Sequence, residues 1–341
     1  MRKILAAIIA EFIRDPQKRR NFREKYSRSP LNRKLDEINA KLDWLGAFGC
    51  ATTDIRNIPA ARGNLHLTQA AATNALALFD MVCREHGLKY FLGAGNLLGV
   101  SLLDGRPLPW DDDIDVYMMR QDYEKALKIL PEVFKNSGIR LAYQGYLLKF
   151  CGYKDFPFCL DICPFDQYFE RADSDAEKAA VLSRLKKFCR NITSKTWFNL
   201  LNRKKGWEYA DGNFSIPEKL AKRYESEKQR WAVEIMRGKK TAPDGLLVRG
   251  FERGATMFQY MFDYDWVFPL KRTSYNGVET YIPNDMESCL RAEYGDYHML
   301  TPRVPIQHSH SSRLKLSPAA LASAREFISM DMKKFYKGLK K

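Results

Sequence analysis

The sequence predicts an α+β fold in which a mixed sheet forms the core and helices are added around it. Residues 65–86 place apolar side chains at helical spacing, whereas the segments after residue 88 alternate apolar and polar side chains in short runs, as strands do. A chain of 341 residues, 45% of them hydrophobic, is long enough to bury one elaborated domain or two.

The first 45 residues predict a basic amphipathic helix followed by a second helix. Apolar side chains recur at helical spacing over residues 4–13, and basic residues crowd residues 18–25. Such a segment can rest on an anionic membrane surface, or pack on the protein's own core or another subunit, and the pattern allows both. No run approaches the roughly 20 apolar residues that span a bilayer. Residues 1–13 lack a cleavage site, so we expect neither a spanning helix nor a signal peptide.

The next segment leads into the first strongly predicted helix. Residues 46–64 contain glycine and proline without a helical period and predict a linker. A helix from Leu65 to His86 follows, and Gly87 stands where a helix-ending glycine is expected. Residues 88–92 then predict a short strand.

The sequence Gly93-Ala94-Gly95-Asn96 predicts a turn between this strand and a short apolar helix. Backbone N–H groups at such a turn can bind a phosphate. Gly93, Gly95 and Asn96 are therefore candidate phosphate-binding residues, although many strand–helix turns contain glycine for structural reasons alone.

The strongest chemical signal is Trp-Asp-Asp-Asp-Ile-Asp-Val at residues 110–116. Because side chains alternate along a strand, Asp113 and Asp115 point to one face, and their apolar neighbours predict a partly buried strand. Four carboxylates in five residues repel one another unless cations neutralise them. We therefore expect Asp113 and Asp115 to bind one Mg²⁺ or Mn²⁺ ion, or to bridge two ions about 4 Å apart. Asp111 and Asp112 are expected to support these ligands or shape the turn. An acidic loop without metal is the alternative.

A third carboxylate, Asp161, lies between Leu160 and Ile162 in a predicted strand over residues 158–162. An unpaired carboxylate would be unexpected there, so Asp161 is a third metal ligand or a base for an attacking hydroxyl. Residues 141–150 predict the strand before it. Lys149 on that strand is a candidate phosphate contact, with a solvated surface lysine as the alternative.

Seven cysteines, an odd number, favour reduced thiols and a cytoplasmic protein over a disulfide framework. Cys151, Cys159 and Cys163 are spaced by 8 and 4 residues, which is not a common zinc-binding pattern. Ordinary buried cysteines are the favoured interpretation, and zinc stays open.

The net charge of +15 is concentrated in two segments. Residues 1–45 hold 12 Lys and Arg against 6 Asp and Glu, and residues 171–250 hold 19 against 10. This excess suggests docking surfaces around the acidic strand, for an anionic lipid, an anionic substrate or nucleic acid. Because the acidic strand would repel a nucleic-acid backbone, no nucleic-acid partner is expected.

Together, the glycine turn, the Asp-x-Asp strand and the third aspartate resemble the nucleotidyltransferase fold of the DNA polymerase beta type. The segments YFLGAGNLLGV, PWDDDIDVYMMRQDYEKAL and LDICPFD resemble the LicD family of phosphocholine transferases, which shares its core with the fukutin-related ribitol-phosphate transferases. A further stretch from Val267 to Tyr297 is also similar, so the resemblance covers residues 65–300 in separate blocks.

The resemblance implies an enzyme that transfers phosphocholine or a polyol phosphate from a CDP-linked donor to a glycan hydroxyl and releases CMP. It implies a magnesium-bound diphosphate, and it places Tyr294, Gly295 and Asp296 at the site. The chain departs from the family at Asn96, where threonine is usual, but an asparagine amide can also donate to phosphate. A usual Arg-His pair is replaced by apolar residues, and Arg106 is a candidate substitute for the lost charge.

These observations predict four parts: basic N-terminal helices and a linker (1–62), a nucleotidyltransferase-like core (63–170), a basic helical insertion (171–250) and a C-terminal part that completes the domain (251–341). We expect a cytoplasmic enzyme, peripheral on the inner face of the membrane, of undetermined oligomeric state. Two alternatives stay open: a nucleotidyltransferase that releases pyrophosphate, and a non-enzymatic module that docks on membranes or nucleic acid.

Overall fold

The computed structural model describes residues 54–144, 147–168, 174–192, 207–209, 218–234, 245–250, 261–298 and 315–340, with scattered residues between 15 and 49. The chain divides into two compact units, one of Met1–Asp54 with Met299–Ile306 and one of Ile55–His298 with Gln307–Lys341.

In the first unit, the described residues between 34 and 45 are helical, and their exposed apolar side chains recur three or four residues apart, at Leu35, Ile38, Leu42 and Leu45. The basic helix predicted before them lies outside the described residues, apart from Asp15 and Lys18.

The second unit is built on a mixed eight-stranded sheet. Its strands are β1 (Phe91–Leu92), β2 (Asp113–Met119), β3 (Ile139–Gln144), β4 (Leu147–Tyr153), β5 (Phe156–Tyr168), β6 (Trp207–Tyr209), β7 (Leu246–Arg249) and β8 (Met261–Asp263). The order is β1-β2-β5-β4-β3-β6, and β7 pairs with β5 and with β8. β2 and β5 run parallel, and the other pairs are antiparallel. The predicted α+β class with a mixed sheet is therefore confirmed.

One predicted strand is in fact two. The interval 141–150 predicted as a single strand holds most of β3 and the start of β4, which pair antiparallel. Apolar side chains occur in both strands, so the sequence pattern alone did not separate them.

β5 is the strand that joins the parts of this sheet. Its 13 residues pair with β2 on one side, and with β4 and then β7 on the other. Side chains alternate along it, so Phe158 and Leu160 face the helical layer whereas Cys159 and Asp161 face the opposite side. The long strand therefore connects the apolar core to a polar face.

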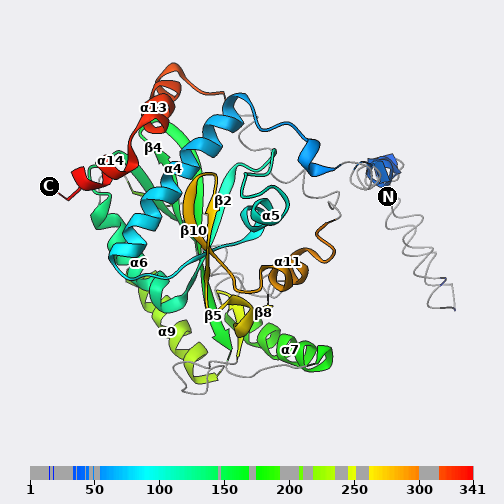
Figure 1. Cartoon of the computed structure of the whole chain (residues 1–341). Coiled ribbons are helices and arrows are strands. Elements are labelled where there is room, and N and C mark those ends of the chain that lie inside the picture. The colour runs from blue at the N-terminus through cyan, green and yellow to red at the C-terminus, as the bar shows by residue number, and fades with distance from the viewer. Residues whose placement is uncertain are drawn as a thin grey trace, which may run out of the picture. The chain divides into compact units, whose positions relative to one another are not determined.

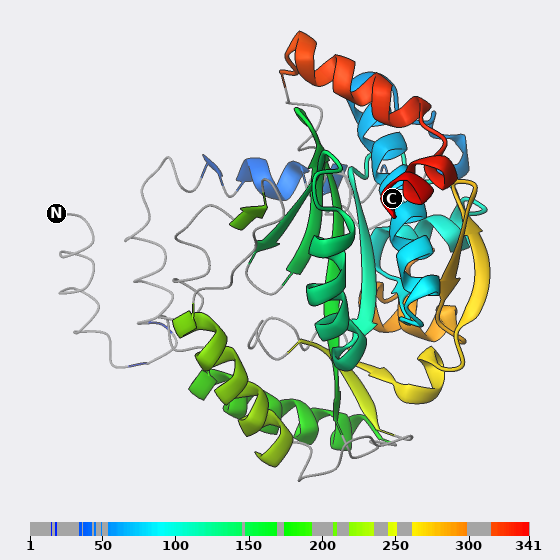
Figure 2. The same cartoon turned by 90° about the vertical axis from the view of Figure 1, so that its left-hand side faces the viewer.

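Helix α4 (Gly63–Glu85) covers the apolar side of the sheet. It buries Phe79, whose ring meets those of Tyr90 and Phe150 edge to face. The helix ends as predicted, because Gly87 adopts a left-handed conformation with φ of +64°. Figure 2 shows α13 (Pro318–Ser329) on the same side of the sheet as α4.

Two further helices attached to this core are α6 (Arg120–Val133) and α14 (Met332–Gly338). Arg120 at the start of α6 forms a bidentate pair with Asp166 of β5, at 2.7 and 2.6 Å. α14 lies against α4, where the Tyr336 hydroxyl donates to Glu85. The two contacts attach helices from distant parts of the sequence to one core.

Between β1 and β2 lies α5 (Ala94–Leu102), so the helix begins inside the predicted turn. The predicted strand over 88–92 is reduced to Phe91 and Leu92. Gly93 is the N-cap, and the four-residue motif thus forms the first turn of a helix rather than a separate loop.

The C-terminal part consists of α10 (Tyr264–Val267), the hairpin of β9 (Lys271–Tyr275) and β10 (Val278–Ile282), and α11 (Met286–Tyr294). A tight turn at Asn276-Gly277 joins the two strands of the hairpin, with positive φ at both residues. The hairpin is tied to the core through Thr280, which donates to Tyr90, which in turn donates to the buried Asp80. Figure 1 shows α11 beside α5.

The segment expected to be a helical insertion is more mixed than predicted. It contains α7 (Asp175–Ile192) and α9 (Glu218–Glu234), but its β6 and β7 belong to the central sheet. Short strands paired at long range carry little local signal, which is why periodicity missed them.

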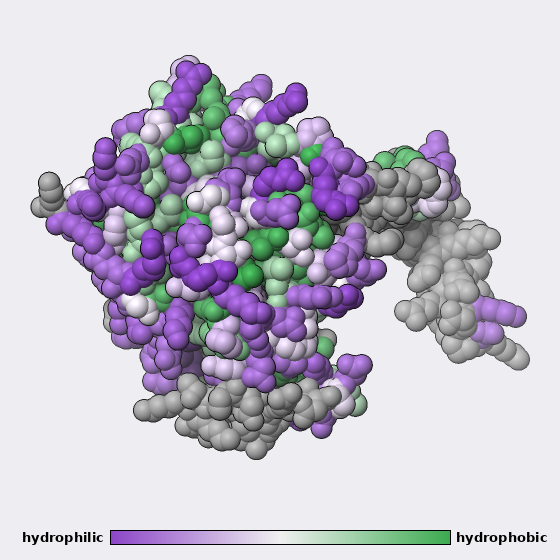
Figure 3. Space-filling view, viewed as in Figure 1, coloured by the Kyte–Doolittle hydropathy of each residue, from purple (hydrophilic) through white to green (hydrophobic). Residues whose placement is uncertain are grey.

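On the face in Figure 3, hydrophilic side chains predominate and apolar groups lie between them. Among the described helices, none combines the length and the apolar character needed to cross a bilayer.

Phe327 of α13 offers a test of the helical layer. Its fully buried ring stacks on Phe158 at 5.3 Å and on Tyr153 at 4.8 Å. We expect Phe327→Ala to lower the free energy of unfolding by about 3–5 kcal/mol, since it leaves a cavity between helix and sheet. Urea unfolding measures this, with exposed Arg325→Ala on the same helix as control. Equal midpoints for the two variants would mean that α13 is not docked there.

Candidate active site formed by buried carboxylates

The parallel pairing of β2 and β5 brings the predicted aspartates together. Asp113 and Asp115 share one face of β2, and Asp161 of β5 is the register partner of Asp115. Neighbouring strands lie about 4.8 Å apart, so these side chains project side by side. Asp161 is buried, and Asp113 and Asp115 are half-buried.

Asp111 and Asp112 precede the strand and are buried as well, at 4% and 8% exposure. The Asp111 carboxyl is hydrogen-bonded to that of Asp113 and packs against α5. A Cβ atom on Gly95 would lie 2.4 Å from Asp111 Oδ2, so a larger residue there would force the carboxylate to shift. Asp111 thus contacts the candidate ligand Asp113 directly.

The cluster is electrostatically strained. Burial raises the pKa of Asp111 to about 7, with repulsion from Asp115 adding to it. The pKa of Asp113 is also raised far above its usual range, first by burial and then by Asp115, Asp111 and Asp161. Buried like charges of this kind are relieved by protons or by cations.

Lys149 of β4 reaches the same face. Its Nζ lies 2.9 Å from Asp161 Oδ2, and the Cys159 thiol donates to Asp161 Oδ1 at 2.8 Å. Burial opposes the charge of Lys149, but Asp161 outweighs it and raises the lysine's pKa. Lys149 is therefore not the solvated surface residue of the alternative interpretation, and Asp161 already has a charged partner.

Asn96 has a different task from the one predicted. Its Nδ2 donates to the Asp113 carbonyl at 3.1 Å and to the Tyr275 hydroxyl at 2.9 Å, and its Oδ1 accepts the Asp115 N–H at 2.6 Å. Both amide hydrogens are thus occupied, and the side chain is not placed to donate to a phosphate. Asn96 thereby links α5 and Tyr275 to the β2 backbone at Asp113 and Asp115.

Close packing also explains why a glycine stands at position 93. A Cβ atom there would lie 2.0 Å from the ring of Tyr117, which is buried in the sheet. The two predicted phosphate-binding glycines therefore allow α5 to approach β2 closely, and only backbone N–H groups remain for an anion.

Two charged residues of the site escaped prediction. Arg249, at the end of β7, is buried, donates to the Tyr117 hydroxyl and lies over that ring at 4.6 Å. Glu293, near the end of α11, accepts the N–H of Ala94 at the start of α5. Burial raises the pKa of Glu293 to about 7, and Asp115 adds to the rise while Arg249 opposes it.

Neither residue belongs to a recognisable local pattern. Arg249 ends an ordinary apolar strand, and Glu293 directly precedes the Tyr294-Gly295-Asp296 block that the family resemblance singled out. Within that block Tyr294 is half-buried, whereas Gly295 and Asp296 are exposed.

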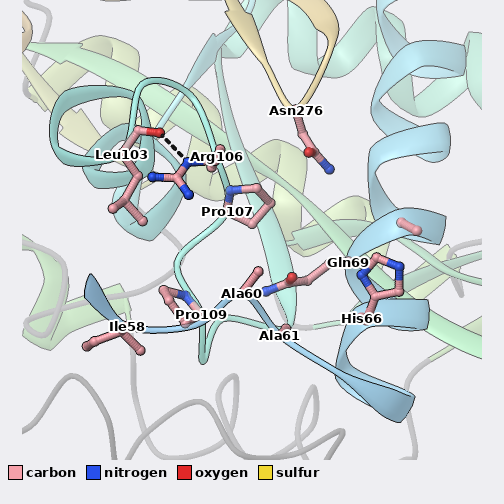
Figure 4. Close-up of a pocket in the computed structure, with 11 residues that line it drawn as sticks. Ile58, Ala60, Ala61, His66, Gln69, Leu103, Arg106, Pro107, Pro109 and Asn276 are labelled. Atoms are coloured by element: carbon pink, nitrogen blue, oxygen red, sulfur yellow. Dashed lines mark hydrogen bonds between the residues drawn. The ribbon is translucent and has the colours of Figure 1, made fainter. Parts of the chain in front are cut away.

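A pocket of about 160 Å³ lies beside the segment that enters β2 (Figure 4). Gln69 of α4 forms part of its wall, and its Nε2 donates to the carbonyls of Leu108 and Asp111 at 2.8 and 2.7 Å. Arg106 also lines it and donates from Nε to the carbonyl of Leu103. The arginine proposed to replace the lost family charge thus faces this pocket, and the described contacts do not join it to the carboxylates.

The donor set suits a hard divalent cation, because all its ligands would be oxygens. Within the described residues, however, no three His, Cys, Asp or Glu side chains already surround a common point for a metal ion. The cysteines have separate partners, since Cys151 contacts the Arg140 carbonyl and Cys159 contacts Asp161. The chemistry of the cluster therefore fits a cation better than its present geometry does.

Comparison with known proteins identifies this region. Residues 87–171 match the family model of the LicD/FKTN/FKRP nucleotidyltransferase domain. The lipopolysaccharide cholinephosphotransferase LicD of Haemophilus influenzae is 39% identical over 61 residues, which cover 18% of this chain and 23% of that protein. An uncharacterized protein of Rickettsia typhi is 34% identical over 97 residues, or 27% of this chain and 29% of that protein.

The matched stretches thus span about a quarter of the length of these curated relatives. Residues 87–171, which the family model matches, contain β2 and β5, so the predicted resemblance to the LicD family and its nucleotidyltransferase fold is confirmed over this segment.

The raised carboxyl pKa values predict how stability depends on pH. The folded protein keeps protons that the unfolded chain, with carboxyl pKa values near 4, has already lost. In buffer with EDTA, the free energy of unfolding should therefore fall by roughly 1–3 kcal/mol as pH rises from 5 to 8. Urea unfolding across this range measures the slope. Asp111→Asn should flatten it, and a slope unchanged in that variant would contradict the origin assigned here.

Proposed function

We propose that this chain, which carries a LicD-family nucleotidyltransferase domain, transfers a phospho-alcohol from a CDP-linked donor to a glycan hydroxyl and releases CMP. The observation that carries the proposal is the placement of Asp113, Asp115 and Asp161 on one face of two parallel strands inside the family-matched segment. Phosphocholine and a polyol phosphate such as ribitol phosphate are the candidate groups.

Asp113, Asp115 and Asp161 would hold the Mg²⁺ or Mn²⁺ ion, which would neutralise the donor diphosphate and the CMP leaving group. The chain's own part is positioning. Asn96 fixes the backbone on both sides of Ile114, and Gln69 holds the carbonyl of Asp111. Such restraint keeps the carboxylates in place before the donor arrives, so less order is lost on binding.

The contacts of Asp161 narrow its possible roles. Lys149 and Cys159 engage its two oxygens, and taking the acceptor's proton would remove the negative charge that holds Lys149. A metal-ligand role is compatible with both contacts, because a carboxylate oxygen can accept a hydrogen bond and bind a cation at the same time. We therefore favour Asp161 as ligand, and Lys149 as the cation that moves between it and a donor phosphate.

The enzyme would act at the cytoplasmic face of a membrane, where lipid-linked glycan precursors are available. The exposed apolar side chains in the helix before residue 46 are compatible with peripheral attachment. Deleting residues 1–30 and measuring liposome binding addresses the basic helix predicted from the sequence.

Binding and product analysis test the proposed activity. We expect CDP-choline or CDP-ribitol to bind in the presence of Mg²⁺, to lose affinity with EDTA, and to yield CMP when an acceptor glycan is supplied. Asp113→Asn should weaken donor binding by about a hundredfold or more, because it removes a ligand of the cation. Asp155→Asn, at an exposed turn, is the matched control. Pyrophosphate release from a nucleoside triphosphate would instead support the nucleotidyltransferase alternative. Binding to membranes or nucleic acid that is sensitive to salt and unchanged by Asp113→Asn would support the docking module.

Lys149 provides a second prediction. If it contacts the donor phosphate, Lys149→Gln should weaken CDP binding about tenfold at saturating Mg²⁺, since a charge-assisted hydrogen bond is lost. Binding of Mg²⁺ alone should not weaken, because Asp161 loses a competing cation. Calorimetric titration measures both. A CDP affinity equal to that of the unmodified protein would limit Lys149 to holding Asp161.

A further inference from the structure

We propose that Glu293 occupies the phosphate-binding position at the start of α5 until the donor arrives, and that the donor phosphate then replaces it. The inference rests on the proposed function, because it assigns the phosphate of that reaction to this position. It adds to the site a residue from α11, nearly 200 positions after the motif it contacts.

The first argument is the identity of the group at the helix start. The first N–H groups of a helix lack partners within it and carry partial positive charge, so they attract anions. In this nine-residue helix the N–H of Ala94 donates to the carboxylate of Glu293. An anion of the chain itself therefore stands where the sequence predicted a phosphate.

The second argument is that Glu293 is poorly satisfied there. Its Oε2 is shielded from solvent and has no hydrogen-bond partner in the part of the chain that the structure describes. Asp115 repels the carboxylate, whereas Arg249 attracts it and the Tyr294 side chain forms a hydrogen bond with it. A buried oxygen without a partner costs roughly 1–3 kcal/mol, so this carboxylate is held less firmly than an anion with all its oxygens paired.

The third argument is what remains when Glu293 leaves. Glu293 meets the N-terminus of α5 and is attracted by the buried guanidinium of Arg249. Arg249 lies close to the same helix start, because it donates to the hydroxyl of Tyr117, whose ring packs against Gly93, the N-cap of α5. A helix start together with an arginine is the combination that binds phosphate in proteins. One anion would replace another, and the charge near Arg249 would be conserved.

The geometry of α11 allows the exchange. Glu293 lies in the last turn of the helix, which ends at Tyr294, and Gly295 follows with φ of +71°. Last turns of helices open more readily than their interiors. Glu293 can therefore turn away without unfolding the hairpin that precedes α11.

Glu293→Gln tests the exchange, because it keeps the size and the acceptor oxygen but removes the charge. At pH 8, where Glu293 is ionised, calorimetry with CDP at saturating Mg²⁺ should show about tenfold tighter binding than in the unmodified protein. The reason is that the phosphate no longer displaces a carboxylate attracted by Arg249 and the helix start. Affinity for Mg²⁺ alone should not change. Glu287→Gln, an exposed residue of the same helix, is the matched control and should leave both affinities as they are.

Weaker CDP binding in Glu293→Gln would overturn the proposal and make Glu293 part of the donor-binding set. Equal binding would overturn it too. Inorganic pyrophosphate with Mg²⁺ separates this failure from failure of the proposed function. If the unmodified protein binds pyrophosphate but not CDP, the donor assignment is wrong, and the pyrophosphate affinities of the two proteins still decide the role of Glu293. Binding of neither probe to either protein would overturn the exchange. Thermal unfolding confirms that each variant is folded.

Discussion

The parallel alignment of β2 with β5 is the constraint on which the site depends. It sets Asp115 directly beside Asp161, whereas a shift of one residue would turn one of them into the apolar layer. The same alternation commits Phe158 and Leu160 to the packing under α4 and α13. Register is therefore fixed twice, once by the apolar core on one face and once by the charges on the other.

This arrangement brings several aspartates together in a buried place, and contacts from neighbouring elements stabilise them there. Asn96 secures the backbone at Asp113 and Asp115, Gln69 secures it at Asp111, and Lys149 neutralises part of the cluster. Each device comes from a different element. The stability of the apolar core thus partly offsets the unfavourable repulsion between the buried carboxylates, as is common where a protein binds cations and phosphates.

Much of the core was predictable because its signals are local. Helical spacing and Gly87 defined α4, and period two placed Asp113 and Asp115 on one face. The partners of those residues were not predictable, because they come from pairings remote in sequence. Nothing near Asn96 indicates that Tyr275 will accept its hydrogen bond, and Arg249 and Glu293 enter the site only through the placement of β7 and α11. The glycine motif misled in part, since Tyr117 and Asp111 explain its small residues by close packing.

The reach of Asn96 has a practical consequence for dissecting this protein. The segment that matches the LicD family model ends at residue 171, yet the side-chain amide of Asn96 within it takes its second acceptor from Tyr275, and β5 takes a partner strand from β7. A fragment cut at the limit of sequence similarity would leave a sheet edge open and a buried amide hydrogen without its acceptor. The segment found by sequence similarity is thus shorter than the segment that folds as one piece. A fragment made to contain the site must extend at least through α11.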